Sequence, residues 1–103
     1  MKVSIALCTY NGEKFLAEQL KSIAGQTRLP DELVICDDCS QDATVDIVRG
    51  FAKVAPFSVR LLTNKTNAGS TKNFERAISL CEGDIIFFIR PGRCLAAGET
   101  AIV

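Results

Sequence analysis

The chain has 103 residues, of which 48% are hydrophobic and 23% are charged, and its formal net charge at pH 7 is zero. This length and balance predict one small globular domain. Because the chain carries neither excess charge nor a basic, aromatic-rich patch, the composition argues against a nucleic-acid partner.

The sequence also argues against a membrane protein. The most strongly apolar run, residues 85–89, is far too short to cross a bilayer. The N-terminal residues enter a strand-like run directly and lack the apolar segment of a signal peptide. We therefore expect no transmembrane segment and a cytoplasmic location. The five cysteines are odd in number and lack framework spacing, so we expect them to be free thiols.

Short apolar runs alternate with segments of helical periodicity. The apolar runs predict strands over residues 3–8, 33–36, 58–62 and 84–89. Three helices are predicted between them, the first capped by Asn11, the second by Ser40 or Asp42, and the third stopped by Gly83. The order βαβαβαβ predicts an α/β fold with an open, mostly parallel, Rossmann-like sheet.

Polar residues follow each of the first three predicted strands. In an open parallel sheet, ligands bind outside the carboxyl ends of the strands, so we expect these residues to meet at one edge. They are Thr9, Tyr10 and Asn11 after the first strand, Asp37 and Asp38 after the second, and residues 64–73, with Asn67, Gly69 and Asn73, after the third. The convergence of three loops predicts a ligand site.

Each of these groups has a structural and a functional interpretation. Asp37 and Asp38 either form a solvated turn beside a helix N-terminus or accept hydrogen bonds from a base or a ribose. Tyr10 is either a half-buried aromatic at a strand end or a platform for a stacked base. Residues 67–70 are either a turn or a set of backbone N–H groups that meet a phosphate.

Cys36 and Cys39 form a Cys-x-x-Cys pair, which raises the hypothesis of a thiol oxidoreductase. Two features argue against it. Cys36 continues a buried strand, whereas a redox pair begins a helix. The two aspartates between the cysteines would also raise the pKa values of the thiols and oppose thiolate formation.

Four segments resemble, in order and spacing, the N-terminal part of family 2 glycosyltransferases: residues 3–11, 32–42, 67–77 and 82–88. Within the second, Asp37-Asp38-Cys39-Ser40 resembles a motif that usually reads Asp-Asp-Gly-Ser, followed by an Asp two residues on. The resemblance implies that residues 1–89 are the nucleotide-sugar-binding half of a GT-A fold, from an enzyme that transfers sugar from a nucleotide-diphosphate sugar to an acceptor. The sugar, the base and the acceptor remain unidentified.

The resemblance also implies roles for the residues at the predicted edge. Tyr10 and Asp38 would hold the nucleotide base. Thr9, Asn11 and Asp37 would shape the same pocket, and the segment with Asn67, Gly69 and Asn73 would border the sugar nucleotide. Asp38→Ala is expected to weaken nucleotide binding while changing stability by no more than about 1 kcal/mol.

The chain departs from the family pattern at two places. Cys39 replaces the usual Gly, which matters if the turn needs a positive φ. The family also expects an Asp-x-Asp motif after residue 89, where it binds Mg²⁺ or Mn²⁺, but residues 90–93 read Arg-Pro-Gly-Arg. We therefore expect no metal ligands and assign no catalytic residue. The alternative to an enzyme is a non-catalytic nucleotide-binding or interaction module of the same fold.

Residues 90–103 are interpreted as a tail outside the family pattern, translated in the wrong reading frame. With permitted codons for residues 89–100, the frame one base later encodes Ser-Asp-Gln-Asp-Asp-Val-Trp-Arg-Pro-Glu-Lys. This string is the metal motif and following segment expected of this branch of the family. Only wobble bases and the choice among synonymous Arg and Leu codons are free. The alternatives are coincidence or a divergent tail.

The last predicted strand, residues 84–89, would lie at an edge of the sheet. It is strongly apolar, and an exposed apolar edge strand invites pairing with another chain. We therefore expect the isolated chain to be marginally stable or to self-associate through this strand.

Overall fold

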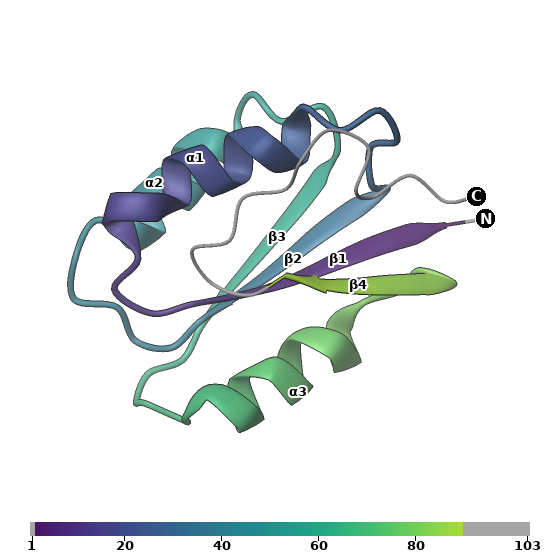
Figure 1. The fold of residues 1–103 in the computed structure, drawn as a ribbon. Helices are drawn as coiled ribbons and strands as arrows, with labels where there is room; N and C mark the ends of the chain where they lie inside the picture. The colour runs from purple at the N-terminus through teal and green to yellow at the C-terminus, as the bar shows by residue number, and fades with distance from the viewer. Residues whose placement is uncertain (1, 90–103) are drawn as a thin grey trace.

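The computed structural model describes residues 2–89, which form a parallel sheet between helices (Figure 1). Its elements are β1 (Val3–Thr9), α1 (Glu13–Ala24), β2 (Glu32–Asp37), α2 (Thr44–Ala52), β3 (Ser58–Thr63), α3 (Ser70–Leu80) and β4 (Ile85–Ile89). The strands lie in the order β3-β2-β1-β4, and every neighbouring pair is parallel. The predicted α/β class and βαβαβαβ order are confirmed. The predicted tail, residues 90–103, lies outside the described residues.

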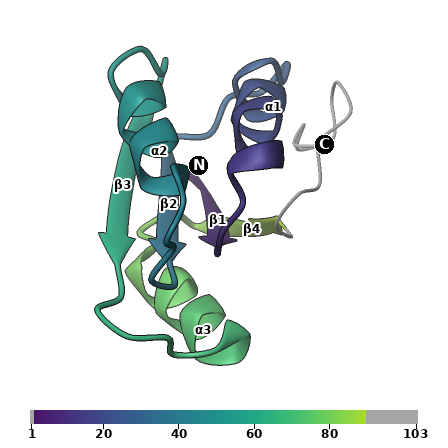
Figure 2. The same ribbon diagram turned by 90° about the vertical axis from the view of Figure 1, so that its left-hand side faces the viewer.

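Helices cover both faces of the sheet: α1 and α2 lie on one face and α3 lies on the other (Figures 1 and 2). Because successive strand residues point to opposite faces, β1 contributes side chains to the core on both faces of the sheet. Ile5 and Leu7 join the core under α1 and α2, whereas Ala6 and Cys8 pack with Ala77 of α3. Every residue of β1 and β2 is buried, as predicted for central strands of a parallel sheet.

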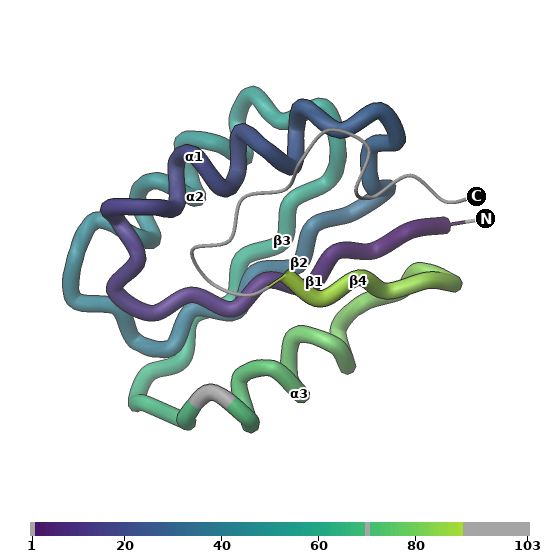
Figure 3. The backbone as a smooth tube through the Cα atoms, viewed as in Figure 1, coloured from purple at the N-terminus to yellow at the C-terminus, as the bar shows by residue number. Residues whose placement is uncertain are grey.

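The strand register brings the carboxyl ends of three strands level. Thr9 of β1 pairs with Asp37 of β2, and Asp37 pairs with Thr63 of β3. The loops that follow these strands therefore gather at one end of the sheet (Figure 3). The edge predicted to hold the site is thus formed by β1, β2 and β3.

The helix ends predicted at Asn11 and Gly83 are wrong, whereas Asp42 does bind the start of α2. Helix α1 follows Gly12, which has no side chain to cap it. Asp42 Oδ1 accepts the N–H of Thr44, the first residue of α2, at 2.9 Å. Asn11 Oδ1 instead accepts a hydrogen bond from the N–H of Gln41, at 2.8 Å, in the next loop. Helix α3 ends at Leu80, ahead of Gly83. Contacts between loops therefore prevail over the local capping preference.

Strand β4 forms an edge of the sheet, next to β1. Its residues alternate in exposure, and Ile86 and Phe88 are its most exposed apolar side chains, at 36% and 39%. The ring of Phe88 packs edge-to-face against that of Phe74 on α3, with centroids 4.2 Å apart. Among residues 2–89, no helix is both long and apolar enough to cross a membrane. The cytoplasmic location stays a prediction.

Candidate functional site

Asp37 is a buried carboxylate that joins the end of β1 to the loop after β2. Its Oδ1 accepts hydrogen bonds from Thr9 Oγ1, at 2.6 Å, and from Ser40 Oγ, at 2.5 Å. Its Oδ2 accepts the N–H of Ser40 at 2.9 Å. The structure thus brings Thr9 and Asp37 together, and the carboxylate holds two strand ends in place.

The loops after β1 and β2 are tied together by further hydrogen bonds. The N–H of Asn11 donates to Ser40 Oγ at 2.8 Å, and Asn11 Oδ1 accepts the N–H of Gln41. The N–H of Gly12 donates to Thr44 Oγ1 at 2.9 Å. Asn11 therefore lies at the predicted edge, where its role is to connect the two loops.

Asp38 holds the third loop, between β3 and α3. Its Oδ1 accepts hydrogen bonds from Asn64 Nδ2, at 3.0 Å, and from the N–H of Ala68, at 2.7 Å. Its Oδ2 accepts the N–H of Gly69 at 3.1 Å. These donors, the N–H of Ala68 foremost, hold the pKa of the Asp38 carboxyl below its usual value. The carboxyl is therefore ionised at neutral pH and acts only as an acceptor.

Gly69 adopts φ +89°, a conformation that L side chains rarely adopt. It directly precedes α3 and places its N–H against Asp38. The predicted site residue Gly69 thus belongs to the same cluster as Asp38.

Two side chains of α3 hold Asn64 in place. Asn64 Nδ2 also donates to Asn73 Oδ1 at 3.0 Å, and Arg76 Nη1 donates to Asn64 Oδ1. Asn73 Nδ2 in turn donates to the carbonyl of Cys36 at 2.8 Å. The structure therefore places Asn73 in the interior, between α3 and β2, where it is 2% exposed.

Asn64 lies in the segment expected at this edge but was not predicted as a site residue, and neither was Arg76. Two signals were available. Asn64 is the first residue beyond β3, as Asp38 is the first beyond β2. Arg76 follows Asn73 by three residues on α3, so the two share a helix face.

Tyr10 and Asn67 are the predicted site residues that remain open to a ligand. Tyr10 is 51% exposed, and the carbonyl of the preceding Thr9 accepts the N–H of Asp38 at 2.9 Å. Asn67 is exposed. Neither side chain donates or accepts a hydrogen bond within residues 2–89. The exposed ring of Tyr10 thus belongs to the residue next to the hydrogen bond between Asp38 and Thr9. This position is suited to stacking on a base.

The thiol oxidoreductase hypothesis loses support. Cys36 is fully buried, and burial raises the pKa of its thiol. Cys39 Sγ lies 3.5 Å from the carbonyl oxygen of Lys65 on the third loop. A redox pair needs an accessible thiolate, which buried Cys36 does not provide.

Cys39 has φ +62°, so the turn after Asp38 does adopt the left-handed conformation. The predicted departure from the usual Gly therefore falls on a strained position, because a non-glycine residue is disfavoured there.

The described residues do not fit a divalent cation. Within residues 2–89, no group of three or more Cys, Asp or Glu side chains is arranged to hold a metal ion, and the chain contains no His. The carboxylates of Asp37 and Asp38 are instead engaged by hydrogen-bond donors. Residues 90–93, where the family motif was expected, lie outside the described residues.

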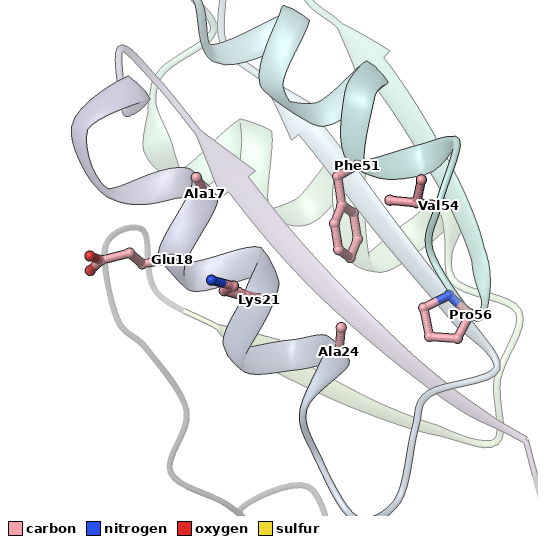
Figure 4. Close-up of a pocket in the computed structure, with 7 residues that line it drawn as sticks. All are labelled: Ala17, Glu18, Lys21, Ala24, Phe51, Val54 and Pro56. Atoms are coloured by element: carbon pink, nitrogen blue, oxygen red, sulfur yellow. The ribbon is translucent and has the colours of Figure 1, made fainter.

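An apolar hollow of about 370 Å³ lies elsewhere, between α1 and α2 (Figure 4). It is lined by Ala17, Glu18, Lys21, Ala24, Phe51, Val54 and Pro56. Its lining residues lie before β2 and before β3, away from the carboxyl edge of the sheet. It contains none of the predicted site residues.

Comparisons with known proteins agree with the resemblance. The sequence model of the family described as Glycosyl transferase family 2 matches residues 4–89. The chain is 36% identical, over 92 residues, to the poly(ribitol-phosphate) beta-N-acetylglucosaminyltransferase TarS of Staphylococcus aureus. That match covers 86% of this chain and 16% of TarS.

Solved structures agree with the fold. The structure of S. aureus TarS 1-349 in complex with UDP superposes with a TM-score of 0.85 at 31% identity, over 95% of this chain and 29% of that one. The mannosyltransferase PcManGT from Pyrobaculum calidifontis, in complex with GDP-Man and Mn²⁺, gives a TM-score of 0.85 at 25% identity, over 93% of this chain and 29% of that one. The chain thus spans less than a third of the length of each of these relatives.

Proposed function

Because the chain belongs to glycosyl transferase family 2, with a GT-A fold over its described residues, we propose that its sheet edge binds the nucleotide of a nucleotide-diphosphate sugar. The sugar would then be transferred to an acceptor. The roles of Tyr10 and Asp38 as base-binding residues, with Thr9, Asn11 and Asp37 shaping the pocket, belong to this proposal. So does the border formed by Asn67, Gly69 and Asn73.

One observation carries the proposal. Asp38 is an ionised carboxylate, 8% exposed, which three donors of the third loop fix in place directly beside the backbone of exposed Tyr10. A fixed acceptor next to an aromatic ring can meet both the edge and the face of a base. UDP in the TarS structure and GDP-Man in the PcManGT structure support a nucleotide-diphosphate sugar as donor.

The divalent metal ion expected of the family needs a proposal of its own. PcManGT was solved with Mn²⁺, but the described residues of this chain supply no ligand set for it. We propose that the missing ligands belong to the shifted reading frame of residues 90–103. The chain would then keep most of a nucleotide pocket without transferring sugar. A non-catalytic binding module is the alternative.

Calorimetric titration of the whole chain with UDP and GDP, with and without manganese, tests the proposal. Metal-independent binding of either nucleotide is expected if residues 2–89 hold the pocket and the metal ligands are missing. Tight binding only with manganese would show that the chain has a metal site after all and favours a complete donor site. No binding of any nucleotide would overturn the proposal.

A further inference from the structure

The loop between β1 and α1 carries an Asn-Gly pair, Asn11-Gly12, and the side chain of Asn11 is exposed. Such a pair is prone to spontaneous deamidation, because glycine has no side chain to shield its backbone nitrogen. In that reaction the nitrogen of Gly12 attacks Cγ of Asn11 and closes a succinimide ring. The Cγ–Nδ2 bond breaks, and Nδ2 leaves as ammonia with the proton of the Gly12 N–H. Water then opens the ring at either carbonyl and gives aspartate or isoaspartate.

Both reacting groups are held by residues of the neighbouring loop. The N–H of Gly12, which supplies the nucleophile, donates to Thr44 Oγ1 at 2.9 Å. Asn11 Oδ1, on the amide that would be attacked, accepts the N–H of Gln41 at 2.8 Å. The side chain of Asn11 cannot fold back onto Gly12 while it bridges to the next loop. Ring closure therefore requires both hydrogen bonds to break.

Thr44 is a fixed acceptor for the Gly12 N–H. It is fully buried at the first position of α2. Its hydroxyl donates to Asp42 Oδ1, which also accepts the N–H of Thr44 at 2.9 Å. The hydrogen bond from Thr44, above all, lowers the pKa of the Asp42 carboxyl, so this carboxylate remains an acceptor at neutral pH. The hydroxyl proton is thus committed to Asp42, and a lone pair of Oγ1 is left for Gly12.

The backbone does not require glycine at position 12. Gly12 has φ −103°, which any residue adopts, and an added Cβ would meet no atom within 4 Å. Gly12→Ala is therefore expected to keep the fold while shielding the nitrogen that attacks Asn11. This separates the reactivity of the pair from its structural role.

We propose that Asn11-Gly12 is a deamidation site that the folded chain keeps closed, with the Thr44 hydroxyl as the group that closes it. The site opens when the loops after β1 and β2 separate, so the modification marks chains in which these loops have come apart. Either product carries a negative charge at the sheet edge. That charge would repel the diphosphate of the proposed function, but the deamidation site itself does not depend on that function.

The test follows deamidation of the whole chain in mildly alkaline buffer. Peptide mapping by mass spectrometry measures the conversion of Asn11 to aspartate and isoaspartate. A synthetic peptide of residues 6–16, which lacks both partners of the pair, gives the unprotected rate. We expect the chain to react at least about tenfold more slowly than the peptide, because each hydrogen bond that must break contributes roughly a threefold to tenfold factor. Equal rates would overturn the proposal.

Variants of Thr44 test the role of its hydroxyl. Thr44→Val removes the acceptor and should speed deamidation of Asn11 by about threefold to tenfold. Thr44→Ser keeps the hydroxyl and should react as slowly as the wild type. Thr71→Val, at an exposed position of α3, is the matched control for loss of a threonine hydroxyl and should leave the rate unchanged. Gly12→Ala should suppress the reaction in each background.

Two further measurements separate this role from a general loss of stability. Exposed Asn67 serves as a reference in the same chain, because unfolding would speed deamidation there as well. The N–H of Gly12 should also exchange slowly with solvent in the wild type and faster in Thr44→Val. Equal acceleration at Asn11 and Asn67, or no acceleration at Asn11, would overturn the role of Thr44. If Thr44→Val fails to fold, the comparison with the peptide and the exchange rate of the wild-type Gly12 N–H decide the matter.

Discussion

Asp37 and Asp38 are adjacent in the chain, yet their carboxylates hold different loops. Asp37 binds Thr9, where β1 ends before α1, and Ser40, in the loop that leads to α2; both helices lie on one face of the sheet. Asp38 binds the loop that leads to α3 on the other face. The alternation of successive side chains along a strand explains the division, because β2 ends at Asp37 and the chain continues directly into Asp38.

Asp38→Ala should therefore destabilise the fold as well as weaken nucleotide binding. The substitution leaves the buried Asn64 amide, and two backbone N–H groups of exposed residues, without their acceptor, so we expect unfolding in denaturant to become easier by about 1–3 kcal/mol. Asp46→Ala, at an exposed position of α2, should change stability by less than about 0.5 kcal/mol.

This expectation replaces the one drawn from the sequence, which limited the change in stability to about 1 kcal/mol. A stability loss below about 1 kcal/mol in Asp38→Ala would contradict the network and restore that view.

The sequence was sufficient for the fold, because alternating apolar runs and helical periodicities are local patterns. The four strands were predicted with bounds close to those observed, and a helix was correctly predicted between each successive pair. The location of the site at one edge of the sheet could also be predicted, because the carboxyl ends of parallel strands lie at the same edge.

The partners of the site residues could not be predicted in the same way. Asp38 meets Ala68 and Gly69, and Asn73 meets Cys36, across long stretches of chain. No local pattern specifies such pairs. Asn11 was predicted as a helix cap for the same reason: its local preference was clear, but its partner Gln41 lies in another loop.

Gly83→Ala should destabilise the end of the sheet opposite the site. An added Cβ would lie 2.5 Å from Ser4 Oγ, 2.8 Å from the Ser4 nitrogen and 3.0 Å from the Lys2 carbonyl oxygen. Two of these atoms are backbone, so the strand must shift, at a cost of about 1–3 kcal/mol in the free energy of unfolding.

Gly50→Ala is the matched control for Gly83→Ala. Gly50 lies within α2, where an added Cβ meets nothing within 4 Å. Alanine favours a helix more than glycine does, so this variant should gain up to about 1 kcal/mol. Denaturant titration that gave the same sign for both variants would contradict the packing of Gly83.

Glu32 should make the fold sensitive to acid. Burial would raise the pKa of its carboxyl, but hydrogen bonds from Ser4 Oγ, at 2.5 Å, and from the N–H of Glu82, at 2.6 Å, lower the pKa overall. A pKa lowered in the folded state contributes stability above the unfolded value of about 4.3, which is lost as the pH falls through the folded pKa.

Denaturant titrations from about pH 6 down to about pH 3 should therefore show a steeper loss of stability in the wild type than in Glu32→Gln. Glu75→Gln, at an exposed position of α3, serves as the control for removal of a carboxylate. Parallel stability curves for the wild type and Glu32→Gln would remove Glu32 as a source of the acid sensitivity.

Strand β4 should cause the chain to self-associate. It lies at the sheet edge with Ile86 and Phe88 partly exposed, and an apolar edge presents unpaired backbone groups to a second copy. Light scattering over a concentration series should detect association that Ile86→Lys reduces. Val54→Lys replaces a side chain that is 79% exposed but lies outside every strand, so it should have little effect. A monomer at all concentrations would contradict this role of β4.

The last prediction concerns the coding DNA of residues 89–100. In the shifted frame, the first base of each codon is the middle base of one present codon, and the last base is the first base of the next. Most of the Asp-rich string is therefore constrained by the present residues: its Trp, for example, needs the T of a Leu95 codon and the G of an Ala96 codon, and both are required there. We expect the DNA to encode Ser-Asp-Gln-Asp-Asp-Val-Trp one base later. A gene with the frame restored at residue 89 should produce a chain whose UDP or GDP binding depends on manganese, because carboxylates are the ligands such a cation prefers. Codons that do not yield the Asp-rich string in that frame would rule out the frameshift and leave the tail a divergent sequence.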